Sequence, residues 1–105
     1  MSMGSVIRSI ENLSQSVAAL FGNLAAFTST YATTLINTIE LIKSDVSALS
    51  LTLSQKNEIL NVLNQAENII ISARNVGFIT IEQLNTILEL LQLAVLKVES
   101  FIIFS

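Results

Sequence analysis

Two stretches of this chain decide the fold: LTLSQKNEILNVLNQAENIIIS (residues 51–72) and ITIEQLNTILELLQLAVLKVES (residues 79–100) align at an offset of 28 residues. The aligned identities are Thr52/Thr80, Gln55/Gln83, Asn57/Asn85, Ile59/Ile87, Leu60/Leu88, Leu63/Leu91, Ala66/Ala94 and Ser72/Ser100. In each copy apolar residues recur every three or four positions, which is the period of an amphipathic helix. The repeat therefore predicts a helical hairpin, and a chance similarity of two amphipathic helices would predict the same hairpin.

The ends of both predicted helices carry their own signals. Each copy begins with Thr-x-x-Gln, a capping box in which the Thr oxygen accepts from the third backbone N–H and the Gln side chain reaches back to the cap. Between the copies, ARNVGF (73–78) indicates a helix stop, since Gly77 can adopt the left-handed conformation and Arg74 favours the negative end of the helix dipole. Two separate helices are expected, one on each side of this turn.

The first half of the chain also has a helical period. One apolar stripe is formed by Val6, Ile10, Leu13, Val17, Leu20, Leu24, Phe27 and Tyr31, and a displaced one by Leu35, Ile39, Ile42, Val46 and Leu49. The displacement falls at FTSTYATT (27–34), whose Ser and Thr residues are poor helix formers, so we place a break near Thr28 to Thr30. The alternative is one unbroken N-terminal helix packed on the hairpin.

These patterns predict an all-α protein, an up-down bundle of four helices in a single domain over residues 1–105. The helices are expected at about residues 5–27, 30–48, 53–75 and 81–103.

Composition argues against an enzyme. The chain has no His and no Cys, so it offers no catalytic triad, no zinc site and no cysteine nucleophile, and its three Gly residues stand apart rather than in a phosphate-binding loop. The carboxylates are scattered, and we interpret them as solvated helix surface. We expect no catalytic residue, metal, cofactor or small-molecule substrate.

The last helix is apolar on nearly all sides, and it ends in FIIFS (101–105). A helix of this kind must be buried on several faces, and a small bundle covers only one or two. We therefore predict that a second copy of the protein covers the rest. The predicted subunit interface comprises Leu84, Leu93, Val95, Leu96, Phe101, Ile102, Ile103 and Phe104.

Charge is sparse, at 12% of residues against roughly 25% in typical soluble domains, and the net charge is −3. In an up-down bundle most cations fall toward the end that carries the turn LSLT (49–52): Arg8, Lys43, Lys56 and Lys97. Carboxylates fall there too, so one interpretation is surface ion pairs. The other is contact with a phosphate backbone, because an assembly repeats a few cations many times.

The N-terminus lacks the pattern of a signal peptide. No charge falls between Glu11 and Glu40, but the interval is too rich in Ser, Thr, Asn and Gln for a spanning helix, and we expect a helix buried by protein instead. Lipid contact stays open as an alternative.

A short, charge-poor, cysteine-free helical hairpin that ends in TIEQLNTILELLQLAVLKVESFIIFS (80–105) resembles the small helical-bundle coat proteins of spindle-shaped and rod-shaped archaeal viruses. The resemblance implies a non-enzymatic subunit of a virion or other extracellular assembly, a homopolymer with apolar contacts and double-stranded DNA inside. The low basic content argues against extensive DNA contact. Two other classes stay open, namely a membrane-associated helical protein and a soluble oligomeric interaction module.

Overall fold

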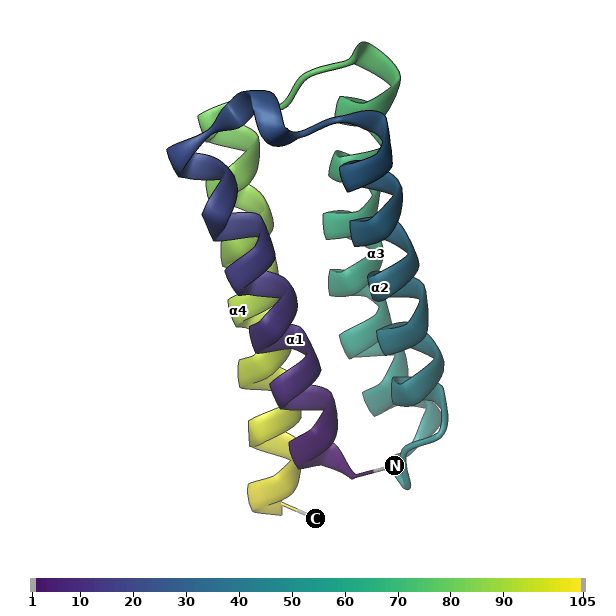
Figure 1. The fold of residues 1–105 in the computed structure, drawn as a ribbon. Helices are drawn as coiled ribbons and strands as arrows, with labels where there is room; N and C mark the ends of the chain where they lie inside the picture. Colours follow the sequence, from purple (N-terminus) through teal and green to yellow (C-terminus); the bar gives the residue numbers. More distant parts are fainter. Residues whose placement is uncertain (1, 105) are drawn as a thin grey trace.

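The computed structural model describes residues 2–104, with side chains through residue 102. Four α-helices run up and down: α1 (Met3–Ala18), α2 (Ser29–Ser47), α3 (Leu53–Val76) and α4 (Ile81–Phe104), with the 3₁₀ turns η1 (Ala19–Gly22) and η2 (Leu24–Ala26) between the first two (Figure 1). Helices α1 and α3 each pack against both α2 and α4. The predicted all-α four-helix bundle is confirmed, and residues 2–104 contain no strand.

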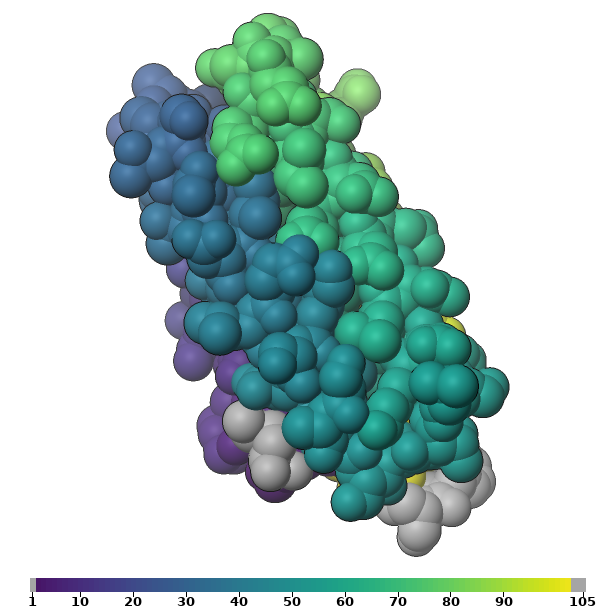
Figure 2. All heavy atoms as spheres, turned by 90° about the vertical axis from the view of Figure 1, so that its right-hand side faces the viewer, coloured from purple at the N-terminus to yellow at the C-terminus, as the bar shows by residue number. Residues whose placement is uncertain are grey.

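The bundle closes around one elongated core, with extents of 42 × 20 × 18 Å between Cα atoms. The repeat residues lie at its centre, since Leu63, Ala66, Leu91 and Ala94 are all fully buried. The two Ala residues leave room for the helices to approach each other closely. Figure 2 shows α2 and α3 packed side by side over one face of the molecule.

The predicted break in the N-terminal half is confirmed, because Thr28 caps α2 by accepting a hydrogen bond from the backbone N–H of Tyr31 at 3.1 Å. The alternative of one long N-terminal helix is therefore wrong. The first helix nevertheless ends at Ala18 rather than near residue 27. Gly22 and Asn23 disfavour a helix interior, and the chain crosses the end of the bundle in two 3₁₀ turns that still bury Leu20.

The other helix ends follow the predicted chemistry. Thr52 and Thr80 each accept from the backbone N–H three residues later at 3.1 Å, and Gln55 and Gln83 each accept from the cap residue's N–H at 3.0 Å. Gly77 ends α3 with a φ of 101°, and its N–H donates to the Ala73 carbonyl at 2.8 Å. Both capping boxes and the glycine stop are confirmed.

Candidate interaction surfaces

The predicted interface residues of α4 divide into two groups by burial. Leu84 and Val95 lie in the subunit's own core, with 0% and 5% of their surfaces exposed, so the prediction that they face a neighbouring copy is wrong. The reason is that α4 packs against both α1 and α3 and so buries a wide arc of its surface. Leu93 and Leu96 are 42% and 51% exposed, and they remain available to a neighbour.

The C-terminal tail extends the last helix, because α4 continues to Phe104. Phe101 is half-buried against the core, and Ile102 is 43% exposed. The side chains of Ile103 and Phe104 lie outside the described part of the chain, so their place in an interface stays a prediction.

The α1–α2 and α3–α4 connections run at the same end of the bundle (Figure 1), and exposed apolar residues lie in or beside both of them. We call this surface the apolar end, and its exposed fractions run from 37% to 66%: Phe21, Leu24, Val76, Phe78 and Ile81. The sequence patterns described above did not locate this surface. One sequence signal for this surface is the interval from Asn12 to Ile39, which carries no charged residue and includes the α1–α2 connection.

Each of the four predicted cationic residues has a hydrogen-bond partner within the subunit. Lys97 Nζ lies 3.4 Å from Glu58 Oε1, and Lys56 Nζ donates to the Ser47 carbonyl at 2.8 Å. Arg8 Nη2 donates to Ser5 Oγ at 3.4 Å. Lys43, the fourth, is paired with two carboxylates and is described next. The interpretation as surface ion pairs therefore fits Lys43 and Lys97, whereas Lys56 and Arg8 bond to neutral groups. Contact with nucleic acid stays a prediction.

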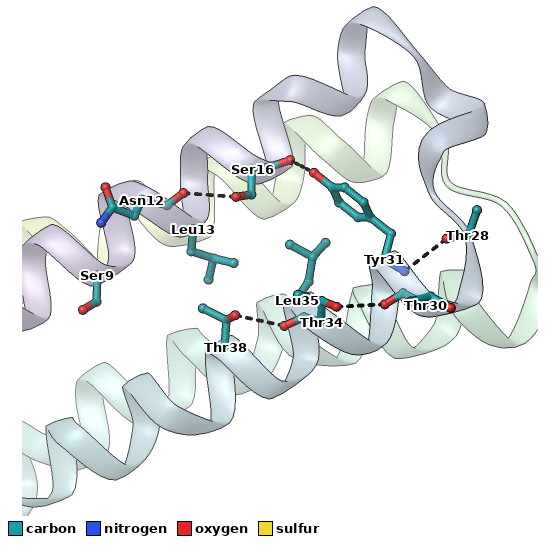
Figure 3. Close-up of a pocket in the computed structure, with 10 residues that line it drawn as sticks. All are labelled: Ser9, Asn12, Leu13, Ser16, Thr28, Thr30, Tyr31, Thr34, Leu35 and Thr38. Carbon is teal, nitrogen blue, oxygen red and sulfur yellow. Dashed lines mark hydrogen bonds between the residues drawn. The ribbon is translucent and has the colours of Figure 1, made fainter.

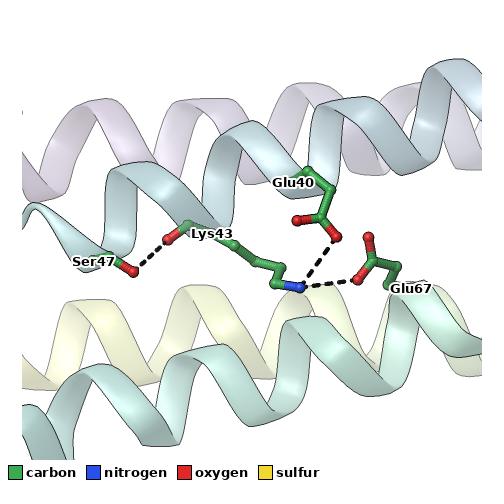
Figure 4. Close-up of polar contacts among 4 residues, drawn as sticks. All are labelled: Glu40, Lys43, Ser47 and Glu67. Atoms are coloured by element: carbon green, nitrogen blue, oxygen red, sulfur yellow. Dashed lines mark hydrogen bonds and ion pairs between the residues drawn. The ribbon is translucent and has the colours of Figure 1, made fainter.

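One carboxylate departs from the predicted solvated surface, because Glu67 on α3 is only 5% exposed. Its Oε1 lies 3.0 Å from Lys43 Nζ on α2, which also lies 3.2 Å from Glu40 Oε1 (Figure 4). The second oxygen, Glu67 Oε2, is buried without a hydrogen-bond partner. Sequence reasoning missed this cluster, since it depends on how α2 and α3 face each other.

The cluster shifts the titration of all three groups. Burial raises the pKa of Glu67 above its ordinary value of 4.5, and the neighbouring Glu40 adds to the rise, although Lys43 opposes it. The pKa of Glu40 is lowered by its contacts with Glu67 and Lys43. Burial alone would lower the pKa of Lys43, but its hydrogen bonds to the two carboxylates outweigh burial and raise it. The cluster is best described as a partly compensated buried charge.

A groove of about 520 Å³ lies between α1 and α2 (Figure 3), and ten residues line it: Ser9, Asn12, Leu13, Ser16, Thr28, Thr30, Tyr31, Thr34, Leu35 and Thr38. None of them is charged. The Tyr31 hydroxyl closes one end by donating to the Ser16 carbonyl at 2.6 Å. The Thr34 and Thr38 hydroxyls already donate to carbonyls of their own helix. These three hydroxyl donors are therefore occupied within the subunit.

Among residues 2–104, no group of three or more acidic side chains is placed to hold a metal ion. No described helix combines the length and apolar character needed to cross a membrane. Comparison of the chain with models of protein families, with curated proteins and with solved structures found no match.

Proposed function

We propose that this protein is a non-enzymatic structural subunit that associates with copies of itself into a filament, tail or capsid shell. The observation that carries the proposal is the outer face of α4. Leu93 and Leu96 stay about half exposed after the bundle has closed its core, whereas the equivalent positions of α3 hold the polar residues Gln65 and Asn68. The exposed parts of these leucines are not used by the fold, and they suit an interface between subunits.

The dimensions of the bundle support association along its length. A face of 42 × 20 Å corresponds to about 800 Å², the area that one partner contributes to a standard protein interface. The sparse charge of the surface also lowers the desolvation penalty of bringing two such faces together. Side-by-side packing is therefore the mode we expect.

A viral coat is the form of this proposal that the resemblance to archaeal coat proteins implies, with double-stranded DNA inside the assembly. The cations that would contact DNA are Arg8, Lys43, Lys56 and Lys97. Because these side chains are already engaged within the subunit, we rest the claim of assembly on α4 alone.

The direct test transfers the polar surface of α3 to α4. The variant Leu93→Gln with Leu96→Asn keeps every core residue, so it should fold with wild-type helicity by circular dichroism. We expect wild type to sediment as large particles in lipid-free buffer, with regular assemblies in negative stain. The variant should need at least about tenfold more protein to assemble, since two apolar anchors are lost.

A control variant changes two leucines elsewhere on the surface, Leu41→Asn with Leu53→Asn, which are both more than two thirds exposed. It should assemble like wild type. A wild type that stays monomeric at all concentrations would overturn the proposal, and unimpaired assembly of the α4 variant would remove α4 as the interface. A small closed oligomer would instead favour a soluble interaction module.

A further inference from the structure

We infer that the apolar end is a lipid-contacting surface, which inserts the tips of the α1–α2 and α3–α4 connections into the boundary between headgroups and acyl chains of a bilayer. The inference goes beyond self-assembly and uses a different part of the molecule. It requires no spanning helix, because only the tips of the bundle enter the lipid.

The first observation is where the exposed apolar side chains come from. Phe21 and Leu24 belong to the 3₁₀ turns before α2, while Val76, Phe78 and Ile81 surround the turn between α3 and α4. The two connections lie at the same end of the bundle, and Figure 2 shows them next to each other at the tip. Two segments far apart in the sequence thus place exposed large apolar residues at one end of the bundle.

The second observation concerns the backbone of the two tips. Backbone N–H groups that leave water without a partner are costly in lipid. In the first tip the N–H groups of Asn23, Ala26, Phe27 and Thr28 all donate to carbonyls within two or three residues, at 2.8 to 3.1 Å. In the second tip Gly77 donates to Ala73, and the Thr80 capping box satisfies two more N–H groups. These internal hydrogen bonds lower the cost of entering a water-poor layer.

The third observation favours lipid over a second copy as the occupant. The end of the bundle has a cross-section of 20 × 18 Å, so a pair of copies in end-to-end contact buries about 700 Å² in total. Stable specific interfaces bury about 1,200 Å² or more. A bilayer sets no such threshold, since each inserted side chain gains its transfer free energy independently of its neighbours.

Charge decides which lipid surface fits. The chain is uncharged from Asn12 to Ile39, and Arg74 and Glu82 are the charged residues of the segment 73–83 around the second tip. Arg74 Nη1 is already engaged with Thr33 Oγ1 at 3.3 Å. With a net charge of −3, the protein has no electrostatic reason to prefer anionic lipid. Insertion should therefore depend on apolar contact, and an uncharged phosphatidylcholine surface should suffice.

The test is flotation of the full chain with phosphatidylcholine vesicles, and with vesicles that also contain phosphatidylglycerol. Wild type should float with both, to a similar extent at low and high salt. The variant Phe21→Asn with Phe78→Asn should bind about tenfold more weakly, because each change removes an inserted aromatic ring. Neither residue belongs to the buried core, so the variant should keep the wild-type helicity.

Two controls separate this result from general stickiness and from assembly. The variant Leu41→Asn with Leu53→Asn, which changes exposed leucines away from the apolar end, should float like wild type. So should Leu93→Gln with Leu96→Asn, whose assembly is impaired under the proposed function. A wild type that stays with the lipid-free fraction, or equal losses in both asparagine variants, would overturn the inference.

Binding only to anionic vesicles at low salt would also overturn it, since that would be an electrostatic contact. A second copy of the protein is the other candidate occupant of the apolar end. It is tested without lipid in the Leu93→Gln, Leu96→Asn variant, whose α4 interface is impaired. If that protein is a dimer and adding the two phenylalanine changes makes it a monomer, the apolar end covers a second copy rather than lipid.

Discussion

Helices α3 and α4 contain the two copies of the sequence repeat, and their differences show which residues the fold requires. Both are 24 residues long, and both begin with a Thr-x-x-Gln capping box. Their inner faces match, since Leu63 and Leu91 occupy equivalent buried positions in the core. Their outer faces do not match, because α3 is polar where α4 exposes leucine. The inner face is set by packing within the bundle, whereas the outer face reflects what each helix meets outside it.

The most informative pair is Glu67 and Val95, which occupy the same position of the repeat and are both 5% exposed. A carboxyl group and an isopropyl group are thus buried to the same extent. The geometry of the bundle decides burial at this position, and the residue type does not. The carboxyl group is tolerated in α3 because Lys43 of the neighbouring α2 supplies a positive charge at 3.0 Å.

The largest effect that tests this comparison is expected in the shared core. Leu63→Ala and Leu91→Ala should each lower the free energy of unfolding by about 2 to 5 kcal/mol, through lost burial and the cavity left behind. If α3 and α4 pack equivalently inside the bundle, the two losses of unfolding free energy should be similar. Chemical denaturation followed by circular dichroism measures both.

Leu53→Ala serves as the matched control, since Leu53 is mostly exposed and its truncation should change stability by less than about 0.5 kcal/mol. A loss in one arm several times larger than in the other would show that the repeat is equivalent in sequence but not in packing.

Much of this fold could be predicted from local signals. The capping boxes, the Gly77 stop and the break at Thr28 each depend on residues within a few positions of one another, so the sequence carries them completely. The core stripe of the hairpin is equally readable, because its period is that of a single helix. Local signals also predict an end for the first helix that lies too late in the chain. The apolar period continues through Leu24, although the chain has already left the α-helix.

The features that the sequence did not reveal depend on contacts between elements that are far apart in the chain. The all-round apolar pattern of α4 predicts Leu84 and Val95 at an external interface, and only the packing of α4 against two helices shows which residues remain exposed. The burial of Glu67 depends likewise on the face that α2 presents. The apolar end requires two connections from different parts of the chain to meet, and no pattern within either connection encodes that meeting.

The second effect concerns pH and the Glu67/Val95 pair. Because the pKa of Glu67 is raised in the folded protein, the folded chain binds this proton more readily than the unfolded chain, and stability should rise as the pH falls from 7 towards 4.5. The rise is limited to about 1.4 kcal/mol per pH unit for one proton. The lowered pKa of Glu40 acts in the other direction, so its contribution is lost below 4.5. Stability should pass through a maximum near this value.

Glu67→Val introduces the residue that α4 has at this position of the repeat. It should remove the rise in stability between pH 7 and 4.5. Unfolding midpoints at a series of pH values measure it. Glu58→Gln is the matched control, because it removes an exposed carboxylate of the same helix and leaves Glu67 in place. A rise that persists in Glu67→Val would have to come from another group, and the buried carboxyl would then have no detectable role.

The smallest effect is expected at the two caps, where the arms are most alike. Thr52→Ala and Thr80→Ala should each lower the free energy of unfolding by about 1 kcal/mol, because each leaves a backbone N–H of the first turn without its acceptor. Thr→Ser at either position keeps the oxygen and should retain most of the stability. Thr80 differs in one respect, since its hydroxyl also donates to Gln83 Oε1 at 3.3 Å. A larger loss for Thr80→Ala would therefore show that this third hydrogen bond contributes. Equal losses would show that it is too long to matter, and unchanged stability in both variants would contradict the capping role of these residues.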